Sequence, residues 1–169
     1  MTNILGIAAT ALALVPAPKE QVWREGTCAY VEADVRHVRD ATLPPEGYRI
    51  DIAPNGVTVA SADDAGAFYA RKTLKQLAWD GGRDEARPSR VPCGTVTDAP
   101  AYRWRGFMLD EGRHFFGKET VKALLDQMAD HKLNVFHWHL TEDQGWRLDI
   151  PGYPELIKYG AVRDRKSVV

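Results

Sequence analysis

Two stretches decide how the second half of this chain folds: residues 105–116, RGFMLDEGRHFF, and residues 132–147, KLNVFHWHLTEDQGWR. The apolar run Gly106–Leu109 in the first predicts a short buried strand, and Asn134–Leu140 in the second predicts another. Between them, residues 118–131 carry apolar side chains at helical spacing, namely Val121, Leu124, Leu125 and Met128. This order predicts a βαβ unit, whose strands run parallel with a right-handed crossover.

Such a βαβ unit belongs to a larger sheet, because parallel sheets carry helices on both faces. A TIM (β/α)8 barrel takes about 250 residues, whereas about 65 residues follow residue 104 here. We therefore expect an incomplete TIM (β/α)8 barrel, of which this chain supplies the first two strands only. With much of its sheet uncovered, this half is predicted to be poorly stable alone.

The first half shows the signals of a small α+β domain. Residues 48–52 alternate apolar and polar side chains, and Asn55-Gly56 is a strong signal for a β-hairpin turn. Asp63 and Asp64 can cap a following helix whose apolar positions are Phe68, Leu74, Leu77 and Ala78. The polar segment 81–89 is typical of a connection. These signals predict an α+β domain at 14–97 and the barrel segment at 98–169.

Composition and charge are those of an ordinary globular protein. With 22 Lys and Arg against 23 Asp and Glu, the formal net charge is -1. No global field therefore attracts nucleic acid or an anionic membrane, whereas a neutral partner such as a sugar fits. Cys28 and Cys93 are too few for a disulfide scaffold and lack the spacing of a zinc site, so two buried free thiols are favoured over a bridge.

The N-terminus predicts export. The apolar stretch Ile4–Val15 is too short to span a bilayer, but it has the length of a signal-peptide core, with Ala11-Leu12-Ala13 as a cleavage signal. We therefore expect a signal peptide at 1–13, a periplasmic or extracellular location and no stable membrane insertion. The alternative is a first buried strand, because residues 1–3 carry no Lys or Arg.

Polar side chains gather past the ends of the two predicted barrel strands: Asp110, Arg113 and His114 after the first, and His137, His139, Glu142, Asp143 and Gln144 at the second. Barrel enzymes build their sites at this C-terminal rim. The period of two in a strand places His137 and His139 on one face, toward the barrel mouth. Two histidines so placed are also typical of zinc sites in amidohydrolase-type barrels, which is one alternative function.

Both quoted stretches resemble the first two barrel strands of glycoside hydrolase family 20, the β-N-acetylhexosaminidases. The resemblance runs from about Leu14 to Arg163, with Gly66–Tyr69 matching the small domain before the barrel. It implies that Arg113 binds hydroxyls of the terminal sugar, for which a guanidinium's rigid fork of donors is suited. It also implies that Glu142 belongs to the polar network supporting the catalytic pair, where many relatives carry aspartate.

The resemblance leaves alternatives for individual residues. His139 and Asp143 are assigned to the substrate-binding rim, although either could instead hydrogen-bond the backbone and hold the loop. For Arg113 the alternative to the sugar contact is a salt bridge to Asp110 or Glu111.

The family resemblance implies exo-hydrolysis of terminal β-linked N-acetylglucosamine or N-acetylgalactosamine with retention. The 2-acetamido oxygen of the substrate acts as the nucleophile, so one enzyme acid suffices, and no metal or cofactor is implied. The catalytic Asp-Glu pair belongs to a later barrel strand, so we expect no catalytic residue before Val169 and no turnover by this chain. A non-catalytic sugar-binding fragment is the other alternative function. Either way, the expected partner is a carbohydrate.

Overall fold

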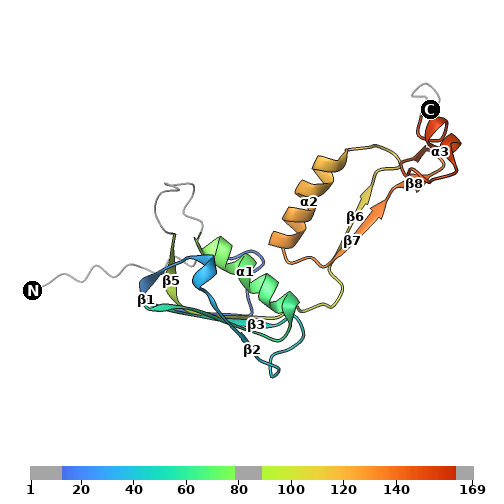
Figure 1. Ribbon diagram of the computed structural model, residues 1–169. Helices are drawn as coiled ribbons and strands as arrows, with labels where there is room; N and C mark the ends of the chain where they lie inside the picture. The colour runs from blue at the N-terminus through green and yellow to red at the C-terminus, as the bar shows by residue number, and fades with distance from the viewer. Residues whose placement is uncertain (1–12, 79–88, 163–169) are drawn as a thin grey trace, which may run out of the picture. The chain divides into compact units, whose positions relative to one another are not determined.

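The computed structural model describes residues 13–78 and 89–162. Most of the predicted signal peptide and of the predicted connection at 81–89 lies outside these residues. The chain forms two compact units, Met1–Arg103 with Asp130–Lys132, and Trp104–Ala129 with Leu133–Val169 (Figure 1). None of the helices in the described ranges is long and apolar enough to cross a membrane.

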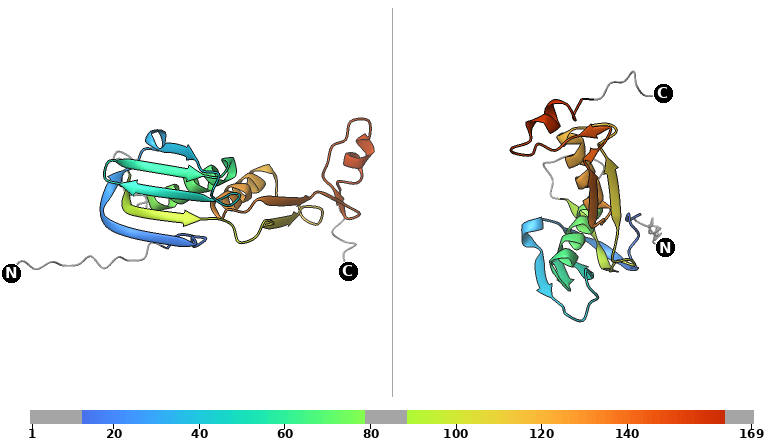
Figure 2. Two further views of the ribbon diagram at one scale, coloured as in Figure 1. Left: turned by 90° about the horizontal axis from the view of Figure 1, so that it is seen from below. Right: turned by 90° about the vertical axis from the view of Figure 1, so that its right-hand side faces the viewer.

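The first unit is a five-stranded sheet with a helix along one face (Figures 1 and 2). The strand order is β1-β5-β3-β4-β2, with all pairs antiparallel except β2 and β4. The elements are β1 (Glu20–Ala29), the short 3-10 helix η1 (Glu32–Asp34), β2 (Arg36–Arg39), β3 (Tyr48–Ala53), β4 (Gly56–Ser61), α1 (Asp64–Ala78) and β5 (Arg90–Asp98).

Alternation along the strands explains the core of this unit. Ile50 and Ile52 of β3 and Val59 of β4 point to one face and are at most 2% exposed, where they pack with Leu74 of α1. Each such side chain, when fully buried, stabilises the folded state by about 1.5–3 kcal/mol. Both cysteines are buried and free, as predicted.

The predicted hairpin is confirmed, with its turn one residue earlier than expected. Ala53 pairs with Gly56, so Pro54 and Asn55 form the two-residue turn and Gly56 opens β4. Proline presets φ for the first turn position, and asparagine tolerates the second, which explains the shift.

Asp63 caps α1, as its position before the helix predicts. Its Oδ1 accepts a hydrogen bond from the Gly66 amide at 2.8 Å, and its Oδ2 accepts one from the Glu46 amide at 2.8 Å. These hydrogen bonds hold the pKa of the Asp63 carboxyl below its ordinary value, and the bond from the Glu46 amide has the largest effect. One carboxylate therefore fixes both the helix start and the preceding loop.

We expect Asp63→Ala to lower the free energy of unfolding of the first unit by about 1 kcal/mol at neutral pH. Because the folded-state pKa is depressed, this stabilisation is present above the unfolded pKa of about 3.9 and is lost as pH falls through the folded value. Urea denaturation at about pH 7 and about pH 3 measures both effects. Asp64→Ala is the control, since that side chain is 99% exposed. Equal losses at the two positions would contradict the capping role.

The second unit contains the predicted strand, helix and strand. They are β6 (Gly106–Asp110), α2 (Lys118–Asp130) and β7 (Val135–His139), and the two strands pair in parallel from Gly106↔Val135 to Asp110↔His139. The small antiparallel pair β8 (Thr141–Glu142) and β9 (Gly145–Trp146) and the helix α3 (Pro154–Lys158) follow, which the sequence patterns did not predict.

The strand pair of the second unit is largely uncovered among the described residues. Phe107, Met108 and Trp138 are 42%, 52% and 41% exposed. Apolar side chains of this size normally lie inside a parallel sheet protein. The described chain is therefore a mixed α+β fold whose second unit leaves much apolar strand surface in solvent.

Candidate functional site

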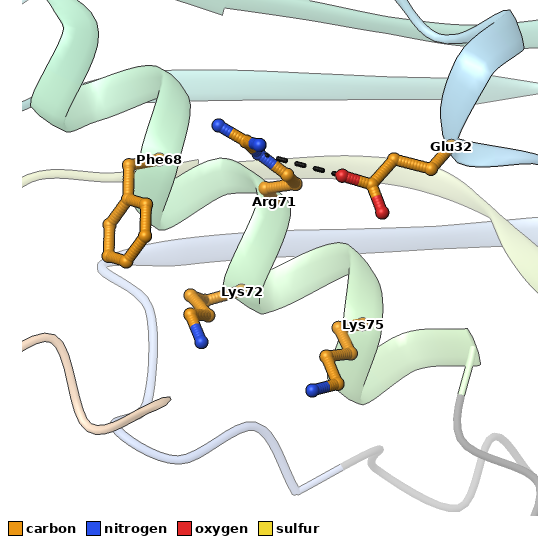
Figure 3. Close-up of a pocket in the computed structure, with 5 residues that line it drawn as sticks. All are labelled: Glu32, Phe68, Arg71, Lys72 and Lys75. Atoms are coloured by element: carbon orange, nitrogen blue, oxygen red, sulfur yellow. Dashed lines mark ion pairs between the residues drawn. The ribbon is translucent and has the colours of Figure 1, made fainter. Parts of the chain in front are cut away.

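The first unit has a cleft of about 240 Å³ beside α1, lined by Glu32, Phe68, Arg71, Lys72 and Lys75 (Figure 3). Its one carboxylate faces Arg71 Nε at 3.7 Å, and Lys72 Nζ pairs with Asp130 Oδ1 at 2.9 Å. Paired charges that are exposed, as Glu32 and Arg71 are, or partly exposed, as Lys72 is, are common on solvated helix faces. Residues lining the cleft form ion pairs of this ordinary kind, whereas the second unit carries the polar group predicted from the sequence.

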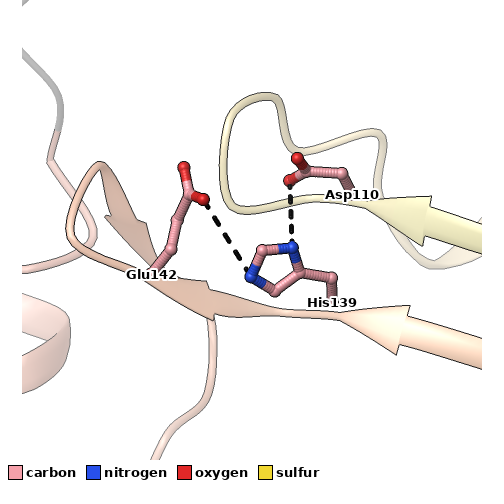
Figure 4. A group of neighbouring side chains, drawn as sticks. All are labelled: Asp110, His139 and Glu142. Carbon is pink, nitrogen blue, oxygen red and sulfur yellow. Dashed lines mark ion pairs between the residues drawn. The ribbon is translucent and has the colours of Figure 1, made fainter.

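The carboxyl ends of β6 and β7 bring a polar group together. Asp110 and His139 are partners in the strand register, so their side chains leave the sheet on the same face. Glu142 of β8 lies beside them, as Figure 4 shows. His139 Nδ1 is 3.8 Å from Asp110 Oδ1, and its Nε2 is 4.0 Å from Glu142 Oε2. The imidazole thus lies between two carboxylates.

Arg113 joins this group from the loop after β6. Its Nη1 forms an ion pair with Asp110 Oδ2, and its Nη2 lies 3.5 Å from Glu142 Oε2. The Arg113 amide also donates to Asp110 Oδ1 at 3.2 Å. That backbone bond, with the nearby guanidinium, holds the pKa of the Asp110 carboxyl below its ordinary value. The salt bridge that the sequence offered as the alternative role of Arg113 is therefore present, and its partner is Asp110.

The salt bridge and a sugar contact can coexist. The Arg113 side chain is 61% exposed, whereas those of Asp110 and Glu142 are 18% and 13% exposed. The two carboxylates therefore orient the guanidinium from within, while a ligand can approach it from solvent. Glu142 Oε1 is buried and accepts no hydrogen bond from the described residues.

The structure brings together three of the four residues predicted for the site: Arg113, His139 and Glu142. Asp143 lies in the turn between β8 and β9, where it is exposed and makes no hydrogen bond or ion pair with the described residues, so its role stays a prediction. His139 also shows the alternative backbone contact, with its Nε2 3.1 Å from the Thr141 carbonyl.

The geometry disfavours the zinc site predicted as an alternative. Among the described residues, the one group that could hold a metal ion is Asp110, His139 and Glu142, whose ligand atoms lie within 4.8 Å of one another, and His137 is not part of it. The guanidinium of Arg113 already pairs with both carboxylates. A cation would compete with it, whereas neutral hydroxyl groups would not.

The sequence patterns did not predict two features of the site. They are the full burial of Glu111 and the close packing of the loop after β6 against Glu142. A Cβ atom on Gly112 would lie 2.6 Å from Glu142 Cγ, so this position accommodates only glycine without movement. Arg147 donates to the Glu111 carbonyl at 3.2 Å and the Gly112 carbonyl at 3.3 Å. The loop that carries Arg113 is therefore packed directly against Glu142 of β8 and is hydrogen-bonded by Arg147.

Residues 102–169 match the model of the catalytic domain of glycosyl hydrolase family 20, and residues 8–99 match the model of domain 2 of the same family. The chain belongs to glycosyl hydrolase family 20. The resemblance inferred from the two barrel-strand stretches is thereby confirmed, and the site at β6 and β7 lies in the part that matches the family's catalytic domain.

Individual family 20 members show how much of such a protein this chain represents. A β-hexosaminidase of Akkermansia muciniphila is 37% identical over 153 residues, which cover 89% of this chain but 30% of that protein. The structure of a β-N-acetylhexosaminidase from Bacteroides fragilis matches 88% of this chain and 37% of its own length, with a TM-score of 0.80 and 32% identity. The chain therefore spans about a third of these relatives.

A further solved relative was crystallised with a sugar. The exo-β-N-acetylglucosaminidase from Vibrio harveyi in complex with N-acetylglucosamine matches 87% of this chain and 28% of its own length, with a TM-score of 0.77 and 28% identity.

Proposed function

We propose that this chain forms the N-terminal part of a β-N-acetylhexosaminidase. In this proposal β6, α2 and β7 are the start of its TIM (β/α)8 barrel, and Arg113, His139 and Glu142 contact the terminal N-acetylhexosamine. Family membership and the relatives' names, including the Vibrio harveyi enzyme with bound N-acetylglucosamine, support the substrate class.

The observation that carries the proposal is the guanidinium of Arg113, oriented by two carboxylates and open to solvent at the ends of two parallel strands. Its planar fork can donate to two adjacent hydroxyls and so fix the orientation of the sugar ring. The two carboxylates can accept hydrogen bonds donated by hydroxyl groups of the same ring. A pyranose offers both kinds of partner, which makes a sugar the ligand best matched to this group.

The proposed reaction is exo-hydrolysis with retention, in which the substrate's acetamido oxygen attacks the anomeric carbon. We place the general acid and the aspartate that orients the acetamido group after Val169, and propose that residues 1–169 bind sugar without turnover. Glu142 would then act on the acid by like-charge repulsion, which favours its protonated form. A non-catalytic sugar-binding fragment is the second candidate function. The group of Arg113, His139 and Glu142 supports it, because this group can bind a sugar while the general acid lies elsewhere.

Domain bounds and location are part of the proposal. We assign residues 14–97 to the family's small α+β domain and 98–169 to the barrel, with residues 1–13 as a signal peptide for export. The carbohydrate partner is then a glycan or oligosaccharide outside the cytoplasm, and no cofactor is involved.

An NMR titration of the chain with N-acetylglucosamine tests the sugar site. We expect shift changes at the amides of Arg113, His139 and Glu142 with N-acetylglucosamine and also with glucose, because the contacts proposed for these residues are to ring hydroxyls that both sugars carry. A parallel titration with Zn²⁺ tests the metal alternative. Shift changes at these residues with Zn²⁺ and none with either sugar would overturn the proposal.

A further inference from the structure

Glu111 is a buried carboxylate with no partner of opposite charge among the ion pairs described. It is 0% exposed, and it is the one member of the second unit among the largest fully buried side chains of the described residues. Burying a carboxylate is costly unless hydrogen bonds compensate it. A carboxylate at the most buried position of a small unit therefore points to a specific task.

Three N–H groups converge on this carboxylate. Oε1 accepts from the Phe116 amide at 2.9 Å and from the Gly117 amide at 3.2 Å, and Oε2 accepts from Nε1 of Trp138. An ionised carboxylate only accepts hydrogen bonds, so this set of donors suits it and no other side chain of its size. The two backbone donors lie just before α2, and the indole comes from β7. Glu111 therefore ties the loop between β6 and α2 to the neighbouring strand.

The loop that Glu111 closes is the one that carries Arg113. Its backbone is held on the other side as well, because Glu111 N donates to the His139 carbonyl at 2.9 Å and Arg147 Nε donates to the Glu111 carbonyl at 3.2 Å. Gly112 packs so closely on Glu142 that an added Cβ atom would lie 2.6 Å from Glu142 Cγ. The separation of Arg113 from Glu142 is thus set by how the loop is held.

We propose that Glu111 is a positioning residue for sugar binding, which acts through the loop on Arg113 and has no contact with the ligand itself. The inference rests on the proposed function of Arg113. Loss of the Glu111 contacts releases the loop between residues 111 and 117, so the guanidinium no longer holds the geometry needed to donate to two hydroxyls at once.

Glu111→Gln is the sharpest test, because it keeps the size of the side chain and changes one acceptor into a donor. The NH2 group of glutamine must face either the two backbone amides or the indole N–H of Trp138. In the first case it opposes two N–H donors, in the second case one, so one or more hydrogen bonds are lost in either orientation. We expect affinity for N-acetylglucosamine, measured by NMR titration, to fall about tenfold or more. Glu119→Gln is the control, since that carboxylate is 77% exposed on α2. It should bind like the parent chain.

The double variant Glu111→Gln, Trp138→Phe separates positioning from general damage. Phenylalanine removes the opposing indole donor, while the glutamine oxygen still accepts from the Phe116 and Gly117 amides. We therefore expect the double variant to bind sugar more tightly than Glu111→Gln alone, a non-additive result that shows direct coupling between the two side chains. This comparison stays informative even if Glu111→Gln destabilises the second unit. The double variant removes the clash between the glutamine NH2 group and the Trp138 indole N–H, so it should restore both the loop and sugar binding.

The outcomes distinguish the two proposals. If Arg113→Ala binds N-acetylglucosamine as tightly as the parent, the sugar site itself is wrong, and the role of Glu111 falls with it. If Arg113→Ala loses binding but Glu111→Gln keeps it, the sugar site stands and the positioning role is wrong. Additive losses in the double variant would also overturn the positioning role.

Discussion

Lys132→Met is expected to lower the free energy of unfolding of the first unit by about 3 kcal/mol. Lys132 Nζ donates to Asp98 Oδ2 at 2.9 Å and to the Tyr48 hydroxyl at 2.7 Å, and the two charged side chains are 9% and 12% exposed. Burial also raises the pKa of the Tyr48 phenol, so the hydroxyl stays neutral. Removing the ammonium therefore leaves the Asp98 carboxylate buried without its counter-charge.

Urea denaturation followed through the amide resonances of β3 and β4 measures this loss. Lys72→Met is the matched control, because Lys72 also pairs at 2.9 Å but its partner Asp130 is 37% exposed. Lys72 itself is 18% exposed, so this pair is more solvated than the Lys132–Asp98 pair, and we expect it to contribute about 1 kcal/mol or less. Losses of equal size for the two lysines would show that burial of the Asp98 pair is not what stabilises the unit.

Arg113→Ala is expected to lower kcat/KM for an aryl N-acetylglucosaminide by about a hundredfold in the protein encoded by the complete reading frame. Two charge-assisted hydrogen bonds to sugar hydroxyls, each contributing about 1.5 kcal/mol, account for a loss of that size. Arg113→Lys should recover part of it, because an ammonium keeps the charge but lacks the planar fork.

The control for this effect is Lys118→Ala, which removes a cation that is 78% exposed at the start of α2. It should change kcat/KM by less than about threefold. Full activity in Arg113→Lys would contradict the need for two directed donors, and full activity in Arg113→Ala would show that Arg113 does not contact the sugar.

Long periodic segments of the fold were predictable from the sequence. The apolar runs around residues 106–109 and 134–140 with a helical pattern between them led to the parallel strand pair. Alternation from Tyr48 to Ile52 before a turn signal led to the hairpin. The pair β8 and β9 was not predictable, because each strand has two residues and no period can be read from two positions.

Long-range polar contacts were the other part that patterns could not supply. Lys132 lies 34 residues from Asp98 and 84 from Tyr48 along the chain, and nothing local marks it as buried. Glu111 follows Asp110 directly in a polar stretch, where a charged side chain suggests solvent exposure. Its burial depends on three N–H donors that only the folded loop brings together.

The site residues at the carboxyl ends of the two parallel strands could be predicted from the sequence. Arg113, His139 and Glu142 were assigned from the family resemblance and the rule that barrel sites form at the carboxyl ends of strands, and the structure brings these three side chains together. Which carboxylate pairs with Arg113 was left open between Asp110 and Glu111. Alternation resolves it, since neighbours in a strand point to opposite faces and Asp110 shares the face of His139.

An assay with para-nitrophenyl N-acetyl-β-D-glucosaminide on two proteins, residues 1–169 and the product of the complete reading frame, tests whether residues 1–169 bind sugar without turnover. We predict release of the phenol by the complete product and none above the uncatalysed rate by residues 1–169. The nitrophenolate can leave with little help from an acid, so the expected loss comes mainly from the absent aspartate that orients the acetamido nucleophile. Turnover by residues 1–169 would place catalytic residues within this chain and overturn the proposed division of the site. A complete product that releases no phenol would overturn the proposed hexosaminidase activity.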